Sequence, residues 1–516
     1  MTTNPYYKQI CDTLPRLLSL FDKDKTSVSY GMGDRYYWAW GLIDFGNGTF
    51  QGAAHGMARL WKNGLWPYKT SKEKFIDRID SMFLATKTLQ RKDGSLEEAF
   101  PNEGSYCVTA LVAYDLLCTI DLLSFEIDIS QKQKWMSIVK PMVDFLVTSN
   151  ETHAIISNHL ATAVAALNRW HLLTADTRVA IKMRALLDRI LKHQSSEGWF
   201  EEYGGADPGY QSLCTYYLAD AHTMNPDLGL LEPLRRSICF LWCFAHPDGS
   251  FGGLYGARCT RFFYPAGFEA LAPEIPEAKA LSDFMLRSIG NMNTVTLMTI
   301  DECNLIPMFN SYCWSVVLRS RYLSGQEIPE LPCMSLRGRL ILNDSGLLID
   351  AGRNYYTIVN IFKGGVVMHF KDGALAVDNG GVIVKNKNGK LGSTQSLSKS
   401  NPVELIGNTV KVKTILSPMP KQLPSPLQFL ILRILSLTIF RVNSFREWTK
   451  QMLVKLLITR RKLWSVSNLR TITLGYDLLV RDELTEKKGY TRIVDTQYFV
   501  SIHMASQGYW QMQDEF

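Results

Sequence analysis

The chain contains an internal repeat, and this feature constrains its fold more than any other. Residues 93–109 read DGSLEEAFPNEGSYCVT, and residues 197–213, EGWFEEYGGADPGYQSL, align with them without a gap. A looser third copy begins at Asp248 with DGSFGGLYGARCTRFFYP. Another loop that leads into a helix, SNETHAIISNHLATAVAAL, lies between the first two copies. Because such loops recur about every 50 residues, the sequence predicts a repeat architecture.

The segments between these loops have apolar residues at every third or fourth position, which is typical of amphipathic helices. Examples are QKWMSIVKPMVDFLVT and VAIKMRALLDRILKHQ. About 50 residues are enough for one pair of ordinary helices with their turns. Roughly five or six pairs fit before the pattern ends. We therefore expect residues 1–330 to form a ring of helical hairpins, an α/α toroid, with its loops gathered at one end.

The pattern changes after the proline- and glycine-containing stretch SGQEIPELPCMSL at 324–336. Short segments rich in β-branched and aromatic residues follow, such as YYTIVNIF and GGVVMHF, and Gly, Asn and Asp separate them. This pattern predicts an antiparallel β domain over residues 335–516, most simply a β-sandwich. The expected fold class is therefore α+β and multidomain, with a catalytic toroid followed by a β-sandwich.

One segment, residues 424–464, interrupts the strands and carries the net charge of the chain. It has eight basic residues against one acid, and the whole protein has a net charge of +7. The rest is balanced, which disfavours a nucleic-acid partner. Its apolar run is short and interrupted by Arg433, so it suits an anionic membrane surface better than a membrane span. The alternative is a basic amphipathic helical insertion packed on the toroid.

The compartment is indicated by two negative observations. The N-terminus, MTTNPYYKQICDTLPRLL, lacks the basic start and apolar core of a signal peptide. The ten cysteines form no CxxC pair, and no histidine completes a metal-ligand pattern, so we expect neither a metal site nor a cofactor. We expect a cytoplasmic protein with reduced thiols, located peripherally at the inner face of the membrane. The sequence leaves its oligomeric state open.

Candidate chemistry lies at the loop ends of two expected helices. Ser157 is a candidate N-cap, which would place Asn158 and His159 in a first turn, where free N–H groups attract a carboxylate. The alternative is that these side chains only satisfy local backbone groups. Tyr210 lies one repeat later at the same end, and a phenol can transfer protons. Its repeat counterpart Tyr106 favours a purely architectural role instead.

The sequence resembles the heparinase II and III-like polysaccharide lyases and the related alginate lyases. The resemblance rests on Asn158 and His159 at a helix start, on Tyr210 some fifty residues later, and on a toroid followed by a β-sandwich. The resemblance implies cleavage of an acidic, uronic-acid-containing polysaccharide or oligosaccharide by β-elimination. It implies that Asn158 and His159 neutralise the uronate carboxylate and that Tyr210 transfers the proton. Tyr217 matches a second tyrosine near the site in some members.

The chain departs from these lyases in two respects. Their β domain contributes a histidine from a Gly-His-x-His-x-Asp-like stretch, and here GGVVMHFKDGALAVDNGG retains His369 and Asp372 without the flanking pattern. We expect His369 on the wall of the cleft opposite Tyr210. The lyases are also exported, whereas this chain shows no export signal, which suggests a role in assembling an envelope polysaccharide.

Other residues are candidates for holding an acidic sugar. Arg258 and Arg261 lie in the third loop copy, although loop arginines are often only solvated. Trp40 belongs to an aromatic stretch that could stack on sugar rings or pack in the toroid core. Glu202 is a further candidate for binding the substrate.

Three other functions fit the same residues. Glu201, Glu202 and Asp207 would allow an inverting glycoside hydrolase, which needs two carboxylates about 6.5–9.5 Å apart. A uronyl C5-epimerase begins with the same proton abstraction as a lyase. A non-catalytic protein that binds carbohydrate or assists its assembly would explain the altered surroundings of His369.

Overall fold

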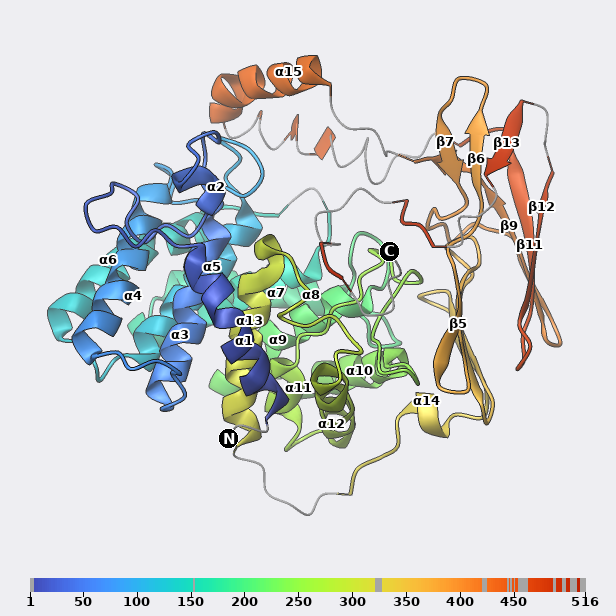
Figure 1. The fold of residues 1–516 in the computed structure, drawn as a ribbon, viewed down its shortest axis with the longest axis horizontal. Helices are drawn as coiled ribbons and strands as arrows, with labels where there is room; N and C mark the ends of the chain where they lie inside the picture. The colour runs from blue at the N-terminus through green and yellow to red at the C-terminus, as the bar shows by residue number, and fades with distance from the viewer. Residues whose placement is uncertain are drawn as a thin grey trace.

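The computed structural model describes residues 4–151, 154–320, 327–419, 425–442, 445, 448–449, 451–452, 463–485, 489–493, 498–501 and 508–510. Helices occupy the chain up to α13 (Glu302–Arg319), and strands begin with β1 (Gly338–Leu342). The stretch predicted as a boundary falls between these two elements. The helical part and the sheets lie side by side (Figure 1). The predicted fold class, an α/α toroid followed by an antiparallel β-sandwich, is confirmed.

Six inner helices form a closed ring in the described part of the chain, because each packs against the next and the last packs against the first. They are buried over most of their circumference, as helices that are apolar on all sides should be. The inner helices are α3 (Ala53–Lys62), α5 (Tyr106–Leu122), α7 (Ser157–Thr174), α9 (Pro208–Met224), α11 (Ala266–Leu271) and α13. The outer helices are α4 (Lys72–Leu89), α6 (Ile129–Thr148), α8 (Thr177–Lys192), α10 (Leu231–Leu241), α12 (Pro276–Gly290) and α1 (Pro5–Ser19).

Short helical segments complete the toroid and its link to the sheets. They are α2 (Arg35–Trp38), η1 (Gly48–Gly52), η2 (Pro226–Leu228), η3 (Trp242–Phe244) and α14 (Pro332–Ser335).

The three loop copies seen in the sequence are also a structural repeat. Gly94, Gly198 and Gly249 occupy the same turn, each with a φ between 85° and 98°. Each glycine N–H donates to the carbonyl oxygen three residues earlier, at 2.9, 2.9 and 3.0 Å. A Cβ on Gly94 or Gly198 would lie 2.1 Å from the carbonyl oxygen of Pro141 or Arg236, respectively. Two constraints therefore require glycine at this turn: the positive φ and the close approach of a carbonyl oxygen from an outer helix.

Among the described residues, the β domain contains three sheets in which all strand pairs are antiparallel. The first sheet has the order β1-β2-β3-β4-β5, with β2 (Leu347–Ala351), β3 (Tyr355–Asn360), β4 (Val366–Lys371) and β5 (Ala374–Asn379). The second has the order β12-β11-β9-β8, formed by β8 (Val403–Ile406), β9 (Thr409–Ile415), β11 (Ser467–Thr473) and β12 (Leu479–Leu484). The third has the order β10-β7-β6-β13, formed by β6 (Ile383–Asn386), β7 (Leu391–Ser393), β10 (Ser417–Pro418) and β13 (Tyr490–Ile493).

The central strands of the first sheet, β2 to β4, are buried on both faces. One face packs on the second sheet, where Val359 and Val367 meet Val410 and Val412. The other face joins the core of the toroid. There the hydroxyl of Tyr356 donates to the carbonyl of Cys243 (2.7 Å), and the ring of Phe370 stacks on His246 at 4.5 Å. The sheet and the helical ring therefore share one hydrophobic core.

Helix α15 (Pro426–Leu437) and the short η4 (Ile439–Arg441) follow β10 in the chain and lie at one side of the toroid, near α2 (Figure 1). An ion pair between Arg433 and Asp44 (3.0 Å) holds α15 there. Much of the predicted insertion 424–464, including six of its basic residues, lies outside the described residues. Among the described residues, no helix is both long and apolar enough to cross a membrane.

Candidate functional site

Asn158 and His159 lie in the first turn of α7, as predicted, but Ser157 is not the N-cap. The N-cap is Ile156, which makes no side-chain capping bond. Ser157 is already helical, and its hydroxyl donates to the carbonyl of Glu201 at 2.7 Å. This bond ties the start of α7 to the loop of the second repeat copy, and so places the two predicted site elements in contact.

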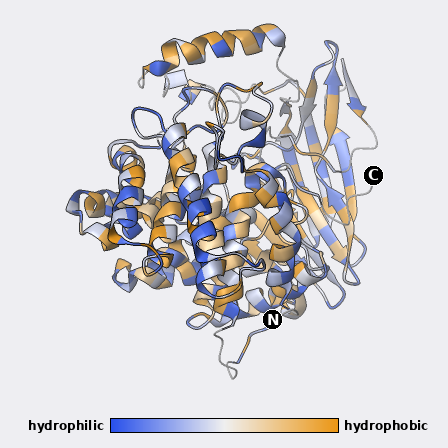
Figure 2. Cartoon of the chain, turned by 60° about the vertical axis from the view of Figure 1, so that its left-hand side comes forward, coloured by the Kyte–Doolittle hydropathy of each residue, from blue (hydrophilic) through white to orange (hydrophobic). Residues whose placement is uncertain are grey.

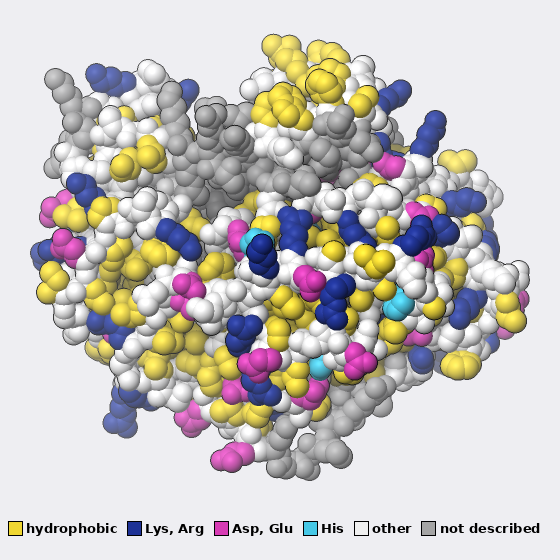
Figure 3. Space-filling view, turned by 180° about the vertical axis from the view of Figure 1, so that it is seen from behind, with side chains coloured by type: hydrophobic (Ala, Val, Ile, Leu, Met, Phe, Trp, Pro, Cys, Tyr) yellow, Lys and Arg dark blue, Asp and Glu magenta, His cyan; other side chains and the backbone are white. Residues whose placement is uncertain are grey.

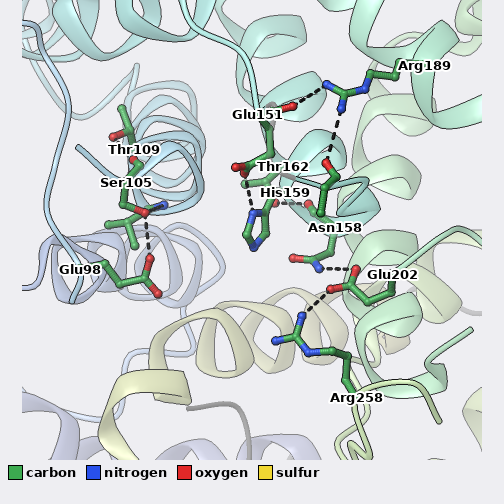
Figure 4. Close-up of polar contacts among 12 residues, drawn as sticks. Glu98, Ser105, Thr109, Glu151, Asn158, His159, Thr162, Arg189, Glu202 and Arg258 are labelled. Carbon is green, nitrogen blue, oxygen red and sulfur yellow. Dashed lines mark hydrogen bonds and ion pairs between the residues drawn. The ribbon is translucent and has the colours of Figure 1, made fainter. Parts of the chain in front are cut away.

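Glu202 joins the start of α7 to the third loop. Its Oε2 accepts from the amide Nδ2 of Asn158 at 2.8 Å, and its Oε1 accepts from Nη1 of Arg258 at 2.9 Å (Figure 4). All three side chains are buried. One carboxylate therefore orients both an amide and a guanidinium that come from different hairpins.

Arg258 also contacts Tyr210. Its guanidinium carbon lies 4.6 Å from the centroid of the Tyr210 ring and 4.5 Å from that of Tyr203, both within the range of cation–π contacts. The Tyr210 side chain is half-buried and meets the ring of Phe262 edge-on. Asn158, Glu202, Arg258 and Tyr210 thus form one continuous cluster of contacts.

Asp207 fixes the positions of both Tyr210 and Arg258. It is the N-cap of α9, and its Oδ1 accepts from the backbone N–H of Tyr210 at 3.1 Å. Its Oδ2 accepts from the backbone N–H of Arg258 at 2.7 Å, and Thr260 donates to the same carboxylate. An aspartate at the N-cap satisfies otherwise unpaired amide groups, which explains its complete burial.

The His159 ring points toward the same region as the Asn158 amide (Figure 4). Its Nδ1 pairs with Oε2 of Glu151 at 2.8 Å, and its side chain is 21% exposed. Burial lowers the pKa of the imidazole, but Cys107 and Glu151 beside it raise that pKa well above its ordinary value. The raised pKa favours the protonated imidazolium form of His159. Figure 4 shows its ring, the Asn158 amide and the Arg258 guanidinium directed toward one region, with Glu98 and Ser105 beyond it.

Glu202 is balanced between two charge states. Burial raises its pKa to about 7, although Arg258, His159 and the Asn158 amide act in the opposite direction. The carboxylate therefore changes its charge close to neutral pH.

His369 does not face this site, contrary to the expectation from sequence. Side chains alternate along β4, and Met368 and Phe370 point at the toroid. His369 consequently points away from the toroid. Its Nδ1 contacts the hydroxyl of Thr357 on β3 (2.8 Å), and its Nε2 contacts the carbonyl of Tyr476 between β11 and β12 (3.2 Å). It is buried, and we leave it out of the candidate site.

The remaining predicted residues lie outside the cluster. Arg261 is buried in an ion pair with Asp378 of β5, so it joins the toroid to the first sheet. Tyr217 is 1% exposed and packs edge-on against Tyr114 in the core of the ring. Trp40 is 62% exposed in the loop after α2. Tyr106, the counterpart of Tyr210, is buried against Phe145.

Two important residues had no signal in the sequence. Glu151 pairs with His159 from an irregular loop. Lys363 is buried in the turn between β3 and β4, and its Nζ donates to the carbonyls of Leu254 (2.7 Å) and Gly256 (2.5 Å). It holds the third loop, which carries Arg258. Among the described residues, no group of three or more His, Cys, Asp or Glu side chains could hold a metal ion.

Comparison with known proteins shows the fold. No protein-family model and no curated protein matches the sequence. The chondroitin AC lyase of Streptomyces coelicolor A3, solved with chondroitin sulphate, is similar with a TM-score of 0.55 and 10% identity, over 93% of this chain and 66% of that one. A Paenibacillus xanthan lyase is also similar, with a TM-score of 0.49 and 10% identity, over 92% of this chain and 44% of that one. Heparinase III is similar with a TM-score of 0.46 and 9% identity, over 93% of this chain and 78% of that one. The chain therefore shares the toroid-and-sandwich fold of the chondroitin AC lyase structure.

Proposed function

We propose that this protein is a lyase that cleaves a uronic-acid-containing polysaccharide by β-elimination at the cluster of Asn158, His159, Arg258 and Tyr210. The observation that carries the proposal is the contact between Tyr210 and Arg258, which Glu202 links to Asn158. The contact supports the proposal because it brings a phenol close to an amide and a guanidinium, two kinds of donor suited to a carboxylate. A likeness in fold to a chondroitin lyase adds support only as analogy.

The residue types suit each step of the reaction. The His159 cation and the second N–H of the Asn158 amide donate to the uronate carboxylate and stabilise the enolate that forms. Tyr210, as the phenolate, takes the proton from C5. The C4–C5 double bond then forms as the C4–O bond breaks, and the proton passes to the leaving oxygen. The Arg258 guanidinium stabilises negative charge on the Tyr210 phenol.

Two of the three carboxylates that a hydrolase could use, Glu202 and Asp207, are engaged in hydrogen bonds within the protein. Asp207 caps α9 and accepts from the third loop, and Glu202 accepts from Asn158 and Arg258. Both are buried. This arrangement suits positioning better than attack on a glycosidic bond through water, which requires an open space between the carboxylates.

The test is incubation of the full-length protein with a panel of uronate polymers, including chondroitin, heparosan, alginate and polygalacturonate. A lyase yields shortened chains with a C4–C5 double bond, detected by ultraviolet absorbance and by mass spectrometry. Shortened chains that carry added water would instead identify a hydrolase. Chains of unchanged length with inverted C5 would identify an epimerase, and either outcome would reject the proposal.

A further inference from the structure

Helix α15 exposes apolar side chains around most of its circumference. Its exposed apolar residues are between 42% and 65% accessible, and Figure 2 shows the helix at the edge of the molecule, coloured largely as hydrophobic. They are Leu427, Phe429, Leu430, Ile431, Ile434 and Leu437. Burial of such side chains is strongly favourable, so a helix of this kind left open to water marks a surface for interaction.

A second apolar segment lies next to α15. Tyr36, Trp40 and Leu42 are 62–83% exposed, and the ion pair between Arg433 and Asp44 joins their loop to the helix. In the view from behind, apolar side chains gather on the part of the molecule that α15 forms (Figure 3). We call the apolar residues of 36–42 and α15 together the apolar surface. Its two halves come from segments almost 400 residues apart, which argues for a built surface.

The inner side of this region is fixed in place. Ser436 and Phe440 are buried, and the ring of Phe440 packs against Phe100 at 6.0 Å between centroids. Phe100 belongs to the first loop copy, which also carries Glu98 and Ser105 near the candidate site. The exposed side of α15 is therefore presented in a defined orientation, at the loop end of the toroid.

Charge decides between the possible occupants. The segment 424–464 has eight basic residues against one acid, and the rest of the chain is balanced. A symmetric contact between two copies would bring two such segments together and would be opposed by their repulsion. An anionic bilayer attracts the basic residues and accepts the apolar ones, and Trp and Tyr favour the interface between lipid and water.

We propose that the apolar surface docks this protein on an anionic lipid bilayer. The candidate site then lies on the end of the toroid close to the bilayer, where it would meet a glycan attached to or emerging from that membrane. The docking itself does not depend on the proposed reaction, because it can be measured without any substrate.

The test is co-sedimentation of the full-length protein with vesicles of phosphatidylcholine alone or with added phosphatidylglycerol. We expect at least about tenfold stronger binding to the anionic vesicles, and loss of this difference at high salt. The variant Leu430→Glu/Ile434→Glu should bind at least about tenfold more weakly, and Trp40→Ala roughly threefold more weakly. The control is Phe125→Glu. This exposed apolar residue follows the C-terminal end of α5, away from the loop end of the toroid, so the variant should bind vesicles like the wild type.

Unfolding of the variants is checked by circular dichroism, and both substituted α15 residues are more than half exposed in the native protein. Equal recovery with neutral and anionic vesicles would overturn the proposal, as would no recovery with either. A wild-type dimer that becomes a monomer in Leu430→Glu/Ile434→Glu would also overturn it, because the surface would then bind a second copy. The proposal would also be overturned if the full-length protein bound another protein through this surface and did not bind vesicles.

Discussion

Glu202 is the residue on which the geometry of the candidate site depends most. Its two oxygens orient the Asn158 amide and the Arg258 guanidinium, and Arg258 in turn lies against Tyr210. A buried carboxylate between two donors holds both in one arrangement before any substrate arrives. Such preorganisation lets the donors act on a developing charge without rearranging.

The raised pKa of Glu202 predicts a particular pH dependence of stability. Its pKa is about 7 in the folded protein and 4.5 ordinarily, so between these values the folded state keeps a proton that the unfolded state has lost. The free energy of unfolding therefore falls as the pH rises from 4.5 to 7, by up to about 1.4 kcal/mol per unit from this group.

The variant Glu202→Gln has no carboxyl group that titrates at this position. As the pH rises from 4.5 to 7, the free energy of unfolding of the wild type should therefore fall relative to that of the variant. Urea unfolding of both proteins at pH 5, 6, 7 and 8 measures the difference. A difference that does not change with pH would show that Glu202 ionises normally in the folded protein.

The loop copies show how a short element sets the position of a site. Each begins with the same glycine turn, packed closely against the outer helices, and each leads to the loop end of the toroid. The second copy ends in Asp207 and Tyr210, whereas the first ends in the N-cap Ser105 and the buried Tyr106. The repeat therefore supplies equivalent scaffolds, and the side chains at their ends make them different.

The turn at Gly198 should tolerate no side chain. A Cβ there would lie 2.1 Å from the carbonyl oxygen of Arg236, and its φ is +98°. Gly204→Ala in the same loop is the matched control, because its φ is +84° but nothing lies within 4 Å. We expect Gly204→Ala to cost about 1 kcal/mol and Gly198→Ala at least about 2 kcal/mol more, measured by urea unfolding. Equal costs would mean that the turn can shift away from Arg236.

The sequence predicted the elements that depend on local patterns. The loop repeat, the ring of hairpins and the pairing of Asn158 with the loop of Tyr210 all follow from periodicity. The placement of His369, which rested on the resemblance to the lyases, was wrong. The strand β4 is buried on both faces, so its own apolar pattern could not have corrected the placement. The ion pair of His159 with Glu151 depends on how an irregular loop folds, and no periodic pattern encodes that.

At the scale of the whole molecule, the first sheet holds the loops that carry the site. Glu197 of the second loop accepts from the backbone N–H groups of Asp344 and Ser345, at 2.6 and 3.1 Å, in the turn between β1 and β2. Lys363, in the turn between β3 and β4, donates to carbonyls of the third loop. The β domain thus contributes to the site by fixing its loops.

Lys363→Met should therefore lower activity from outside the site. Removing its three donated bonds leaves buried acceptors unsatisfied, at a cost of about 1–3 kcal/mol each, and loosens the loop that carries Arg258. We expect kcat/KM to fall at least about tenfold, with faster proteolysis within residues 248–261. Lys371→Met on the same sheet, which breaks an exposed ion pair, is the control and should change neither. Unchanged proteolysis in Lys363→Met would contradict this role.

The most direct test of the proposed function compares binding and turnover in Tyr210→Phe. The substitution keeps the ring that contacts Arg258 and Phe262 and removes only the hydroxyl. With the polymer cleaved by the wild type, affinity for a short uronate oligosaccharide should stay within about threefold while turnover falls at least about a thousandfold. Tyr106→Phe, in the first loop copy, should leave both unchanged. Turnover above about a tenth of the wild-type value, or a parallel loss of affinity, would contradict proton transfer by Tyr210.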